Sequence, residues 1–327
     1  MKALVCREFG PVETLEIAEM PEPPLAAGSV RVKVRSAGIN FPDGLVVQGK
    51  YQLKPALPFS PGSEFSGTVI EAADGVQGFA PGDRVFGLTS FGAFAEQLVV
   101  PAERLNHMHS SVSFETAAVL SMAYGAAMYA LMERGRLVAG ERVMILGATG
   151  GVGLAAVELA ANAGAHVLAV DGDDLRLKEA EAKGAKAVFN YETGELREAA
   201  KDFAGTDGFD LILDPVGGAL GETAVRCLAW KGRLLVFGFA SGDIPRIATN
   251  LLLLKGAEAI GVFWGESQRR NDNRDVENFR LLQDWLIAGK LSPHIGGHFP
   301  LEDGAAAIQA LMDRKIAGKA VIEVASG

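Results

Sequence analysis

A glycine-rich turn at residues 147–153 is the segment of this sequence with the clearest chemical use. Residues 142–146 form an apolar run typical of a strand, and residues 152–163 have helical periodicity. The turn between them reads Gly147-Ala148-Thr149-Gly150-Gly151-Val152-Gly153. A pyrophosphate needs backbone N–H groups at a helix start, and side chains on the turn would keep it away. We therefore expect dinucleotide binding; the alternative is a tight turn without a ligand.

An acidic residue follows at the end of the next predicted strand, 166–170. Asp171 lies 18 positions after Gly153 (171 − 153), where a carboxylate can accept hydrogen bonds from the adenosine ribose and repel a 2′-phosphate. The alternative is helix capping, because Asp173 and Asp174 also precede the helix predicted from Leu175. Arg176 can reach either a 2′-phosphate or the ribose, so Asp171 favours NADH without excluding NADPH.

The elements that must position these residues fall into two regions that differ in their predicted secondary structure. Up to about residue 110, short β-type runs alternate with Gly and Pro turns. From residue 113, one long helical pattern runs toward residue 132, and apolar strands then alternate with helices, as in a doubly wound parallel sheet. The chain is predicted to be α/β: a β-rich domain of residues 1–121, completed by 266–327, and a dinucleotide-binding domain of residues 122–265.

Composition excludes several classes of protein. The net charge of −9 argues against nucleic-acid and anionic-membrane partners. The two cysteines, Cys6 and Cys227, can build neither a disulfide framework nor a cysteine zinc site, and isolated cysteines are typical of a reducing compartment. The N-terminal residues do not resemble a signal peptide, and no apolar run is long enough to span a bilayer. We expect a cytoplasmic protein.

Several spaced motifs resemble, in order, those of the zinc-independent quinone oxidoreductase branch of the medium-chain dehydrogenase/reductase superfamily. Besides the glycine turn they are Gly38-Ile39-Asn40-Phe41-Pro42-Asp43, Gly49-Lys50-Tyr51, Pro61-Gly62-Ser63-Glu64-Phe65-Ser66-Gly67, Pro81-Gly82-Asp83-Arg84-Val85, Phe189-Asn190-Tyr191, Asp214-Pro215-Val216-Gly217-Gly218 and Gly318-Lys319. The resemblance covers essentially the whole chain. It is far more specific for the superfamily than for the substrate.

The resemblance implies a GroES-like catalytic domain and a Rossmann domain, with the active site in the cleft between them. It also implies a homodimer formed through the edge of the Rossmann sheet, here the predicted strand 259–263. Gly172 and Tyr191 would lie near the adenosine half of the cofactor. Residues near the nicotinamide would be Phe237, Gly238, Phe239, Val262, Phe263 and Trp264. Most of this branch prefers NADPH, which opposes the argument from Asp171.

The same comparison predicts a site without metal. The zinc alcohol dehydrogenases that resemble this chain carry a cysteine at the position of Asn40 and a histidine at that of Ser63, whereas Glu64 is retained. Their structural lobe of four cysteines has no counterpart, because no cysteine lies between Cys6 and Cys227. A catalytic zinc needs three protein ligands.

Without metal, the cofactor supplies the reactivity and the protein must orient and polarise a small-molecule substrate. We expect NAD(P)H-dependent hydride transfer to a quinone or an α,β-unsaturated carbonyl, with Asn40 and Tyr51 donating hydrogen bonds to the oxygen that becomes negative. Tyr51 matches by position a tyrosine of the related enoyl-thioester reductases; alternatively it packs on residues 57–58, and Asn40 satisfies backbone groups. The alternative functions are 2-enoyl-thioester reduction and, less favoured, cofactor binding without turnover.

Overall fold

The computed structural model describes residues 1–324, and the contacts within it divide the chain into two units. Unit 1 is Met1–Met122 together with Gln283–Gly327, and unit 2 is Ala123–Leu282. Both boundaries fall inside helices, α3 (Leu120–Met128) and α10 (Asp275–Ile287). Each unit has its own sheet and is described separately.

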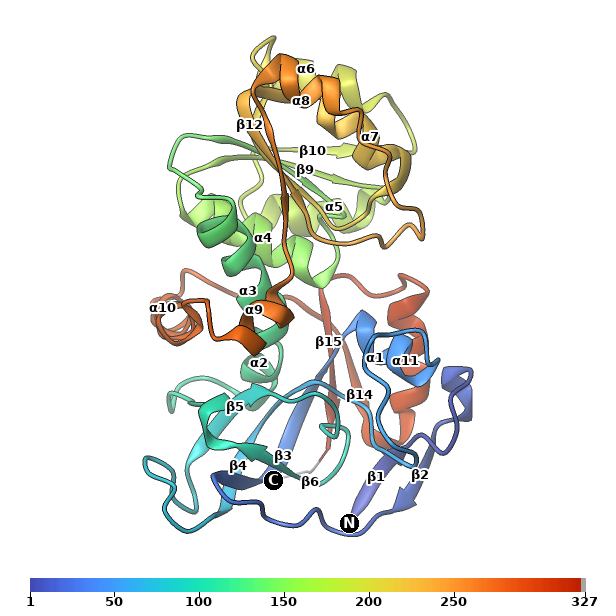
Figure 1. The fold of residues 1–327 in the computed structure, drawn as a ribbon, viewed down its shortest axis with the longest axis vertical. Coiled ribbons are helices and arrows are strands. Elements are labelled where there is room, and N and C mark those ends of the chain that lie inside the picture. The colour runs from blue at the N-terminus through green and yellow to red at the C-terminus, as the bar shows by residue number, and fades with distance from the viewer. Residues whose placement is uncertain (325–327) are drawn as a thin grey trace. The chain divides into compact units, whose positions relative to one another are not determined.

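Unit 1 is built on a mostly antiparallel seven-stranded sheet (Figure 1). The strand order is β14-β15-β3-β4-β5-β7, and β6 also pairs with β3. The strands of unit 1 are β1 (Lys2–Val5), β2 (Glu16–Glu19), β3 (Ser29–Ile39), β4 (Glu64–Ala72), β5 (Arg84–Leu88), β6 (Gln97–Pro101), β7 (Leu105–His107), β14 (Ile295–Pro300) and β15 (Lys319–Glu323). Its helices are α1 (Phe41–Val47), α2 (Phe114–Ala118) and α11 (Gly304–Met312).

The long strand β3 organises unit 1. Its alternate residues Val30, Val32 and Val34 are fully buried, as expected for a strand with one face on a core. At its far end β3 pairs with β15, which comes from the last part of the chain: Ala320 is opposite Ile39 and Val321 is opposite Gly38. This register brings Lys319 beside Asn40.

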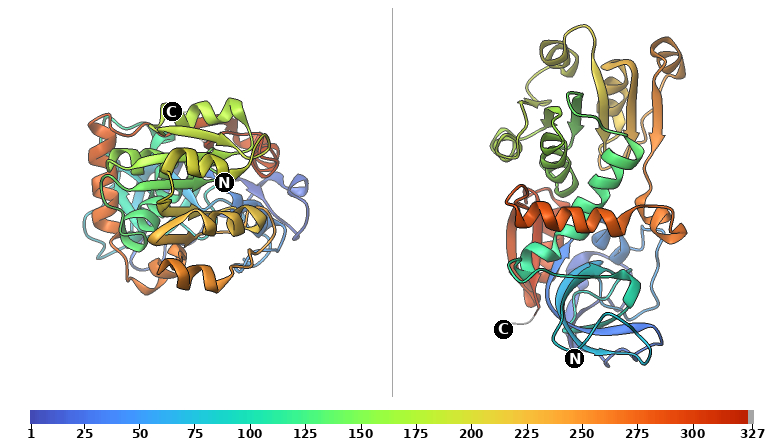
Figure 2. Two further views of the ribbon diagram at one scale, coloured as in Figure 1. Left: turned by 90° about the horizontal axis from the view of Figure 1, so that it is seen from above. Right: turned by 90° about the vertical axis from the view of Figure 1, so that its left-hand side faces the viewer.

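Unit 2 contains a six-stranded sheet in which every pair is parallel, in the order β10-β9-β8-β11-β12-β13. Helices cover both faces of this sheet (Figure 2), as in a Rossmann fold. The strands are β8 (Arg142–Leu146), β9 (His166–Asp171), β10 (Ala187–Asn190), β11 (Phe209–Asp214), β12 (Leu228–Val236) and β13 (Glu258–Gly261). The helices, besides α3 and α10, are α4 (Gly151–Asn162), α5 (Asp174–Ala182), α6 (Leu196–Ala204), α7 (Gly218–Arg226), α8 (Thr249–Lys255) and α9 (Trp264–Arg270).

The predicted α/β class, a β-rich unit and a doubly wound parallel unit, is confirmed. In detail the structure differs at two places. The helix predicted from 113 to 132 is α2, an interruption at Val119, α3 and then a π-helical turn over Tyr129–Arg134. Residues 266–282, predicted to complete the first domain, group with unit 2, where the rings of Trp264 and Phe279 pack over Gly125. The assignment of folding domains stays a prediction.

No helix within residues 1–324 combines the length and the apolar character that crossing a membrane requires.

Candidate active site

The glycine turn joins β8 to α4 and is shaped by close backbone contacts. Gly147 has a φ of +61°, which favours glycine. A Cβ on Gly153 would lie 2.1 Å from the Gly147 carbonyl oxygen, so helix and turn approach too closely for any side chain. Gly150 is the N-cap of α4 and offers no side-chain cap, which leaves N–H groups of the first helical turn for a ligand. This cradle fits the pyrophosphate of a dinucleotide.

Asp171 ends β9 next to this turn. One carboxylate oxygen accepts the Thr149 N–H at 3.0 Å and the other accepts the Gly172 N–H at 2.8 Å. The Tyr191 hydroxyl lies against Gly172, where a Cβ would be 2.8 Å from it. The structure therefore brings Asp171, Gly172 and Tyr191 together at the carboxyl end of the sheet, beside Thr149 of the turn.

The neighbouring acidic residue takes the capping role that was the alternative for Asp171. Asp173 accepts the N–H groups of Leu175 and Arg176, at 2.9 and 3.1 Å, and caps α5. Its other oxygen accepts from Arg176 Nε at 3.0 Å. The guanidinium of Arg176 is thus turned toward Asp173, and Asp171 does not cap the helix.

The residues predicted near the nicotinamide follow β12 and β13. The N–H groups of Phe237 and Gly238 both donate to the Asp214 carbonyl, at 3.0 and 3.3 Å, and Phe239 is exposed. After β13, Val262 is buried and Phe263 is exposed. All these positions lie at the carboxyl ends of parallel strands, the edge that also carries the glycine turn.

Trp264 has a structural partner inside unit 2. Its side chain is buried, and its indole N–H donates to Asp275 Oδ1 at 2.9 Å. Burial raises the pKa of the Asp275 carboxyl, and this hydrogen bond opposes the rise. The polar edge of the indole is therefore occupied within the protein.

In unit 1, Asn40 belongs to a buried polar corner that also contains Asp43, Ser63, Glu64 and Lys319. Asn40 Oδ1 accepts from the Lys319 ammonium at 2.5 Å, while Nδ2 donates to Glu64 Oε1 at 3.1 Å. Weaker contacts join Nδ2 to Ser63 Oγ and the Gly38 carbonyl, at 3.4 and 3.5 Å. The amide group of Asn40 is engaged inside the corner.

Asp43 closes this corner as part of a capping box with Asn40 at the start of α1. Its carboxylate accepts the Asn40 N–H at 2.7 Å and the Ser63 hydroxyl at 3.0 Å. Burial raises the pKa of Asp43 to about 7; these two hydrogen bonds and the Lys319 charge oppose the rise, and the Glu64 charge adds to it. The corner thus holds a carboxyl group that titrates near neutrality.

Tyr51 lies four residues beyond the end of α1. Its half-buried ring packs against the core of unit 1. Among residues 1–324 its hydroxyl has no hydrogen-bond partner. Burial raises the pKa of Tyr51, and the negative charge of Asp43 adds to this effect. The hydroxyl is therefore protonated at neutral pH and unengaged.

Sequence reasoning missed the partners of Glu64 and the role of Lys319. Glu64 is fully buried and accepts from Lys319, from Asn40 and from the Met122 N–H at 2.8 Å. One signal was present: a lysine directly before the apolar run 320–322 begins a buried strand and needs a buried partner. The strand register that supplies this partner is not visible in the sequence.

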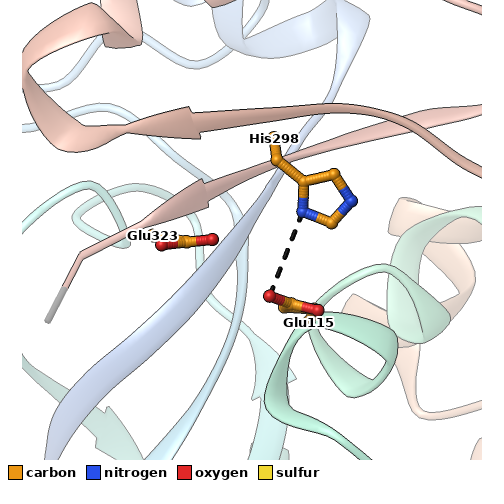
Figure 3. A group of neighbouring side chains, drawn as sticks. All are labelled: Glu115, His298 and Glu323. Carbon is orange, nitrogen blue, oxygen red and sulfur yellow. Dashed lines mark ion pairs between the residues drawn. The ribbon is translucent and has the colours of Figure 1, made fainter. Parts of the chain in front are cut away.

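Three side chains that are able to bind a metal ion lie close together in unit 1. Glu115 of α2, His298 of β14 and Glu323 of β15 are the one group of three such ligands found in residues 1–324, and His298 Nδ1 is 4.0 Å from Glu115 Oε1 (Figure 3). His298 and Glu323 are exposed, and none of the three was predicted for the site. At the Asn40–Ser63 corner an amide, a hydroxyl and an ammonium-paired carboxylate do not fit zinc. The metal-free site stays a prediction.

Comparison with known proteins identifies the family of this chain. A family model described as "Alcohol dehydrogenase GroES-like domain" matches residues 26–110, and one described as "Zinc-binding dehydrogenase" matches residues 151–279. Quinone oxidoreductase-like protein 2 of Rattus norvegicus is 39% identical over 324 residues, which cover 99% of this chain and 92% of the relative. Quinone oxidoreductase of Homo sapiens is 30% identical, over 94% of this chain and 92% of the relative.

The solved structures that resemble this chain include oxidoreductases of the same kind as these relatives. The Escherichia coli quinone oxidoreductase complexed with NADPH superposes with a TM-score of 0.90 at 26% identity, over 99% of this chain and 100% of that one. A probable oxidoreductase from Mycobacterium abscessus gives 0.90 at 34% identity, over 99% and 98%. These findings confirm the family expected from the motifs. The chain belongs to the quinone oxidoreductase family of the medium-chain dehydrogenase/reductase superfamily, a family of nicotinamide-dependent oxidoreductases.

Proposed function

We propose that this protein reduces quinones or α,β-unsaturated carbonyl compounds without a metal. The observation that carries this proposal is the Tyr51 hydroxyl, protonated and unengaged among the described residues, next to a buried polar corner. The glycine turn supports it by fitting a dinucleotide, and relatives named quinone oxidoreductases support the substrate class. When bound, the nicotinamide supplies a hydride from its C4 atom.

The chain's own residues would polarise and protonate the acceptor. As hydride adds to the β-carbon of an enone, the C=C electron pair shifts toward the carbonyl carbon and the C=O π pair moves onto the oxygen. The resulting enolate takes up one proton, which ends on the α-carbon and gives the saturated carbonyl compound. A hydrogen bond from Tyr51 to this oxygen strengthens as negative charge develops, which lowers the barrier. Asn40 was the second predicted donor; because its amide is bonded to Lys319 and Glu64, we propose that it shapes the corner.

A steady-state panel tests this function. NADH and NADPH are each offered with a quinone, a 2-alkenal and a crotonyl thioester, and oxidation of the cofactor is followed against a reaction without enzyme. We expect turnover with the quinone or the alkenal. Turnover confined to the thioester would replace the proposal by enoyl-thioester reduction, and no oxidation with any acceptor would contradict an enzymatic role.

We further propose that NADH is the preferred cofactor. The Asp171 carboxylate lies beside the glycine turn, where its charge repels a 2′-phosphate, and Arg176 is paired with Asp173. Two structural relatives, from Escherichia coli and a mycobacterium, are complexed with NADPH and share 26% and 27% of their residues with this chain.

The expected result is a kcat/KM at least about tenfold higher with NADH than with NADPH, a difference of about 1.4 kcal/mol. Asp171→Asn removes the charge and is expected to lower this ratio by about tenfold. Asp174→Asn is the matched control, because Asp174 is a nearby carboxylate bonded instead to the Asn190 side chain at 2.9 Å. Wild-type enzyme that favours NADPH would refute this role of Asp171.

We also propose a homodimer formed through unit 2. Among the described strands β13 lies at one end of the sheet, and α8 before it exposes Leu253 and Leu254. Unpaired edge strands and exposed apolar side chains are features of interfaces. Light scattering is expected to give twice the chain mass of 34.4 kDa, and Leu253→Glu with Leu254→Glu is expected to lower it. A wild-type protein of single-chain mass at micromolar concentration would disprove the dimer.

A further inference from the structure

Lys319 is a buried cation to which the proposed reaction assigns no role. It starts β15 with only 4% of its surface exposed, although an ammonium is costly to bury without partners. Three oxygens lie within hydrogen-bond distance of its Nζ: the Ile39 carbonyl at 2.8 Å, and Asn40 Oδ1 and Glu64 Oε1 at 2.5 Å each. An ammonium has three hydrogens, so none remains for a substrate. Any effect of Lys319 on a reaction must pass through the groups it holds.

The first of these groups is the Asn40 carboxamide. An ammonium can only donate, so the amide must turn its oxygen toward Lys319 and its nitrogen toward Glu64. The reverse orientation would face two donors toward each other. Lys319 therefore fixes which way Asn40 points.

Asn40 in turn determines where α1 begins. It is the N-cap of this helix, and its backbone N–H is held by Asp43 Oδ2 at 2.7 Å. The helix runs from Phe41 to Val47, and the chain then turns through Gly49, whose φ is +67°, to reach Tyr51. Tyr51 is thus attached to the corner through one short helix and one turn.

The charges of the corner form a second link to Tyr51. Within it one cation, Lys319, faces two carboxyl groups, Glu64 and Asp43, and burial keeps the pKa of Asp43 near 7. Lys319 favours the ionised form of Asp43 and Glu64 opposes it. Burial raises the pKa of the Tyr51 phenol, and the negative charge of Asp43 raises it further.

We propose that Lys319 is a positioning residue for the reduction: its ammonium locks the Asn40–Glu64 corner from which α1 carries Tyr51, and it sets the charge that Tyr51 experiences. This inference rests on the proposed function of Tyr51 as the donor to the substrate oxygen. It predicts that removal of a lysine that touches no substrate changes both the placement and the electrostatics of Tyr51.

The test observes Tyr51 directly. The protein has four tyrosines, so labelling with 3-fluorotyrosine gives four ¹⁹F resonances, and Tyr51→Phe assigns one of them. In the wild type this resonance is expected to titrate with a midpoint near the Asp43 pKa of about 7. In Lys319→Met the midpoint moves to higher pH, because the charge that favours ionised Asp43 is lost, and the resonance shifts or broadens as α1 loosens.

Two further variants make the result specific. Lys319→Met leaves Glu64 buried without its cation. If this variant does not fold, the double variant with Glu64→Gln, which removes the unpaired charge of Glu64, is measured in its place. In the double variant the two charge effects on Asp43 offset, so the midpoint returns toward that of the wild type while the altered line shape remains. Lys315→Met is the matched control: Lys315 is exposed, pairs with Asp313, and is expected to leave the Tyr51 resonance unchanged.

Activity gives the second readout. Lys319→Met, or the double variant, is expected to lower kcat at least about tenfold with an unchanged KM for NADH, and Lys315→Met to stay within about twofold. An unchanged Tyr51 resonance and unchanged kcat in the Lys319 variants would overturn the positioning role. The wild type could reduce no acceptor while the Tyr51 resonance still differs between the wild type and Lys319→Met. In that case the proposed function fails, and the role of Lys319 in placing Tyr51 stands.

Discussion

Tyr51→Phe is expected to lower kcat by about 100-fold or more, because one hydrogen-bond donor to a developing oxyanion is typically worth 10²- to 10³-fold. The change removes one oxygen and keeps the ring that packs on the core of unit 1. The hydroxyl has no partner among residues 1–324, so no internal hydrogen bond is broken and the melting temperature should be unchanged. The measurement is kcat and KM with the best acceptor of the panel, together with a thermal melt.

A matched control comes from another tyrosine whose hydroxyl has no partner among the described residues. Tyr129 lies in the π-helical turn of unit 2, and Tyr129→Phe is expected to keep kcat within about twofold. A loss of less than about tenfold in Tyr51→Phe, or about 1.4 kcal/mol, would assign Tyr51 to packing. An equal loss in both variants would show that the effect is not specific to Tyr51.

Gly153→Ala is expected to destabilise unit 2 and to abolish detectable NADH binding. Its new Cβ would lie 2.1 Å from the Gly147 carbonyl oxygen and 2.8 Å from Ala148 Cα, and both are backbone atoms that cannot rotate away. Overpacking of this kind costs about 1–3 kcal/mol and moves the backbone that forms the cradle. A thermal melt and a fluorescence titration with NADH measure the two losses.

Gly150→Ala distinguishes an effect on NADH binding from an effect on folding. At Gly150 the nearest atom to a new Cβ is the Gly147 carbonyl oxygen at 3.6 Å, an ordinary contact, and φ is −75°. The variant should fold like the wild type, yet its methyl group lies at the N-cap that a pyrophosphate approaches. We expect at least about a tenfold rise in the Kd for NADH, near 1.4 kcal/mol. Unchanged NADH binding in Gly150→Ala would contradict a phosphate cradle at this turn.

Unit 2 was predictable because its signals are local. Each strand is a short apolar run, the glycine turn lies between one strand and the next helix, and Asp171 follows at the end of the neighbouring strand. Parallel strands then bring their carboxyl ends to one edge, so residues far apart in sequence are gathered by the topology alone. The helix break at Val119 was missed because the apolar pattern continues through it.

The buried polar corner of unit 1 depends on contacts that no local pattern encodes. Lys319 and Glu64 are 255 positions apart, and Lys319 reaches Asn40 only because β15 pairs with β3 in one particular register. A shift of that register by one residue would turn Lys319 to the other face of the sheet. The sequence therefore indicates Asn40 and Tyr51 as candidates, whereas the engagement of the Asn40 amide is a property of the folded sheet.

Because β15 is the last strand of the chain, the two sheets can form at different times during synthesis on the ribosome. Every strand of the parallel sheet lies within residues 142–261, so that sheet can assemble while synthesis is still under way. The sheet of unit 1 must wait for residues 319–323, because β15 lies between β14 and β3. Until then β3 has an open edge, and Glu64 has no cation. The parallel sheet of unit 2 can therefore form before the sheet of unit 1 is complete, and β3 is the strand that waits longest for one of its partners.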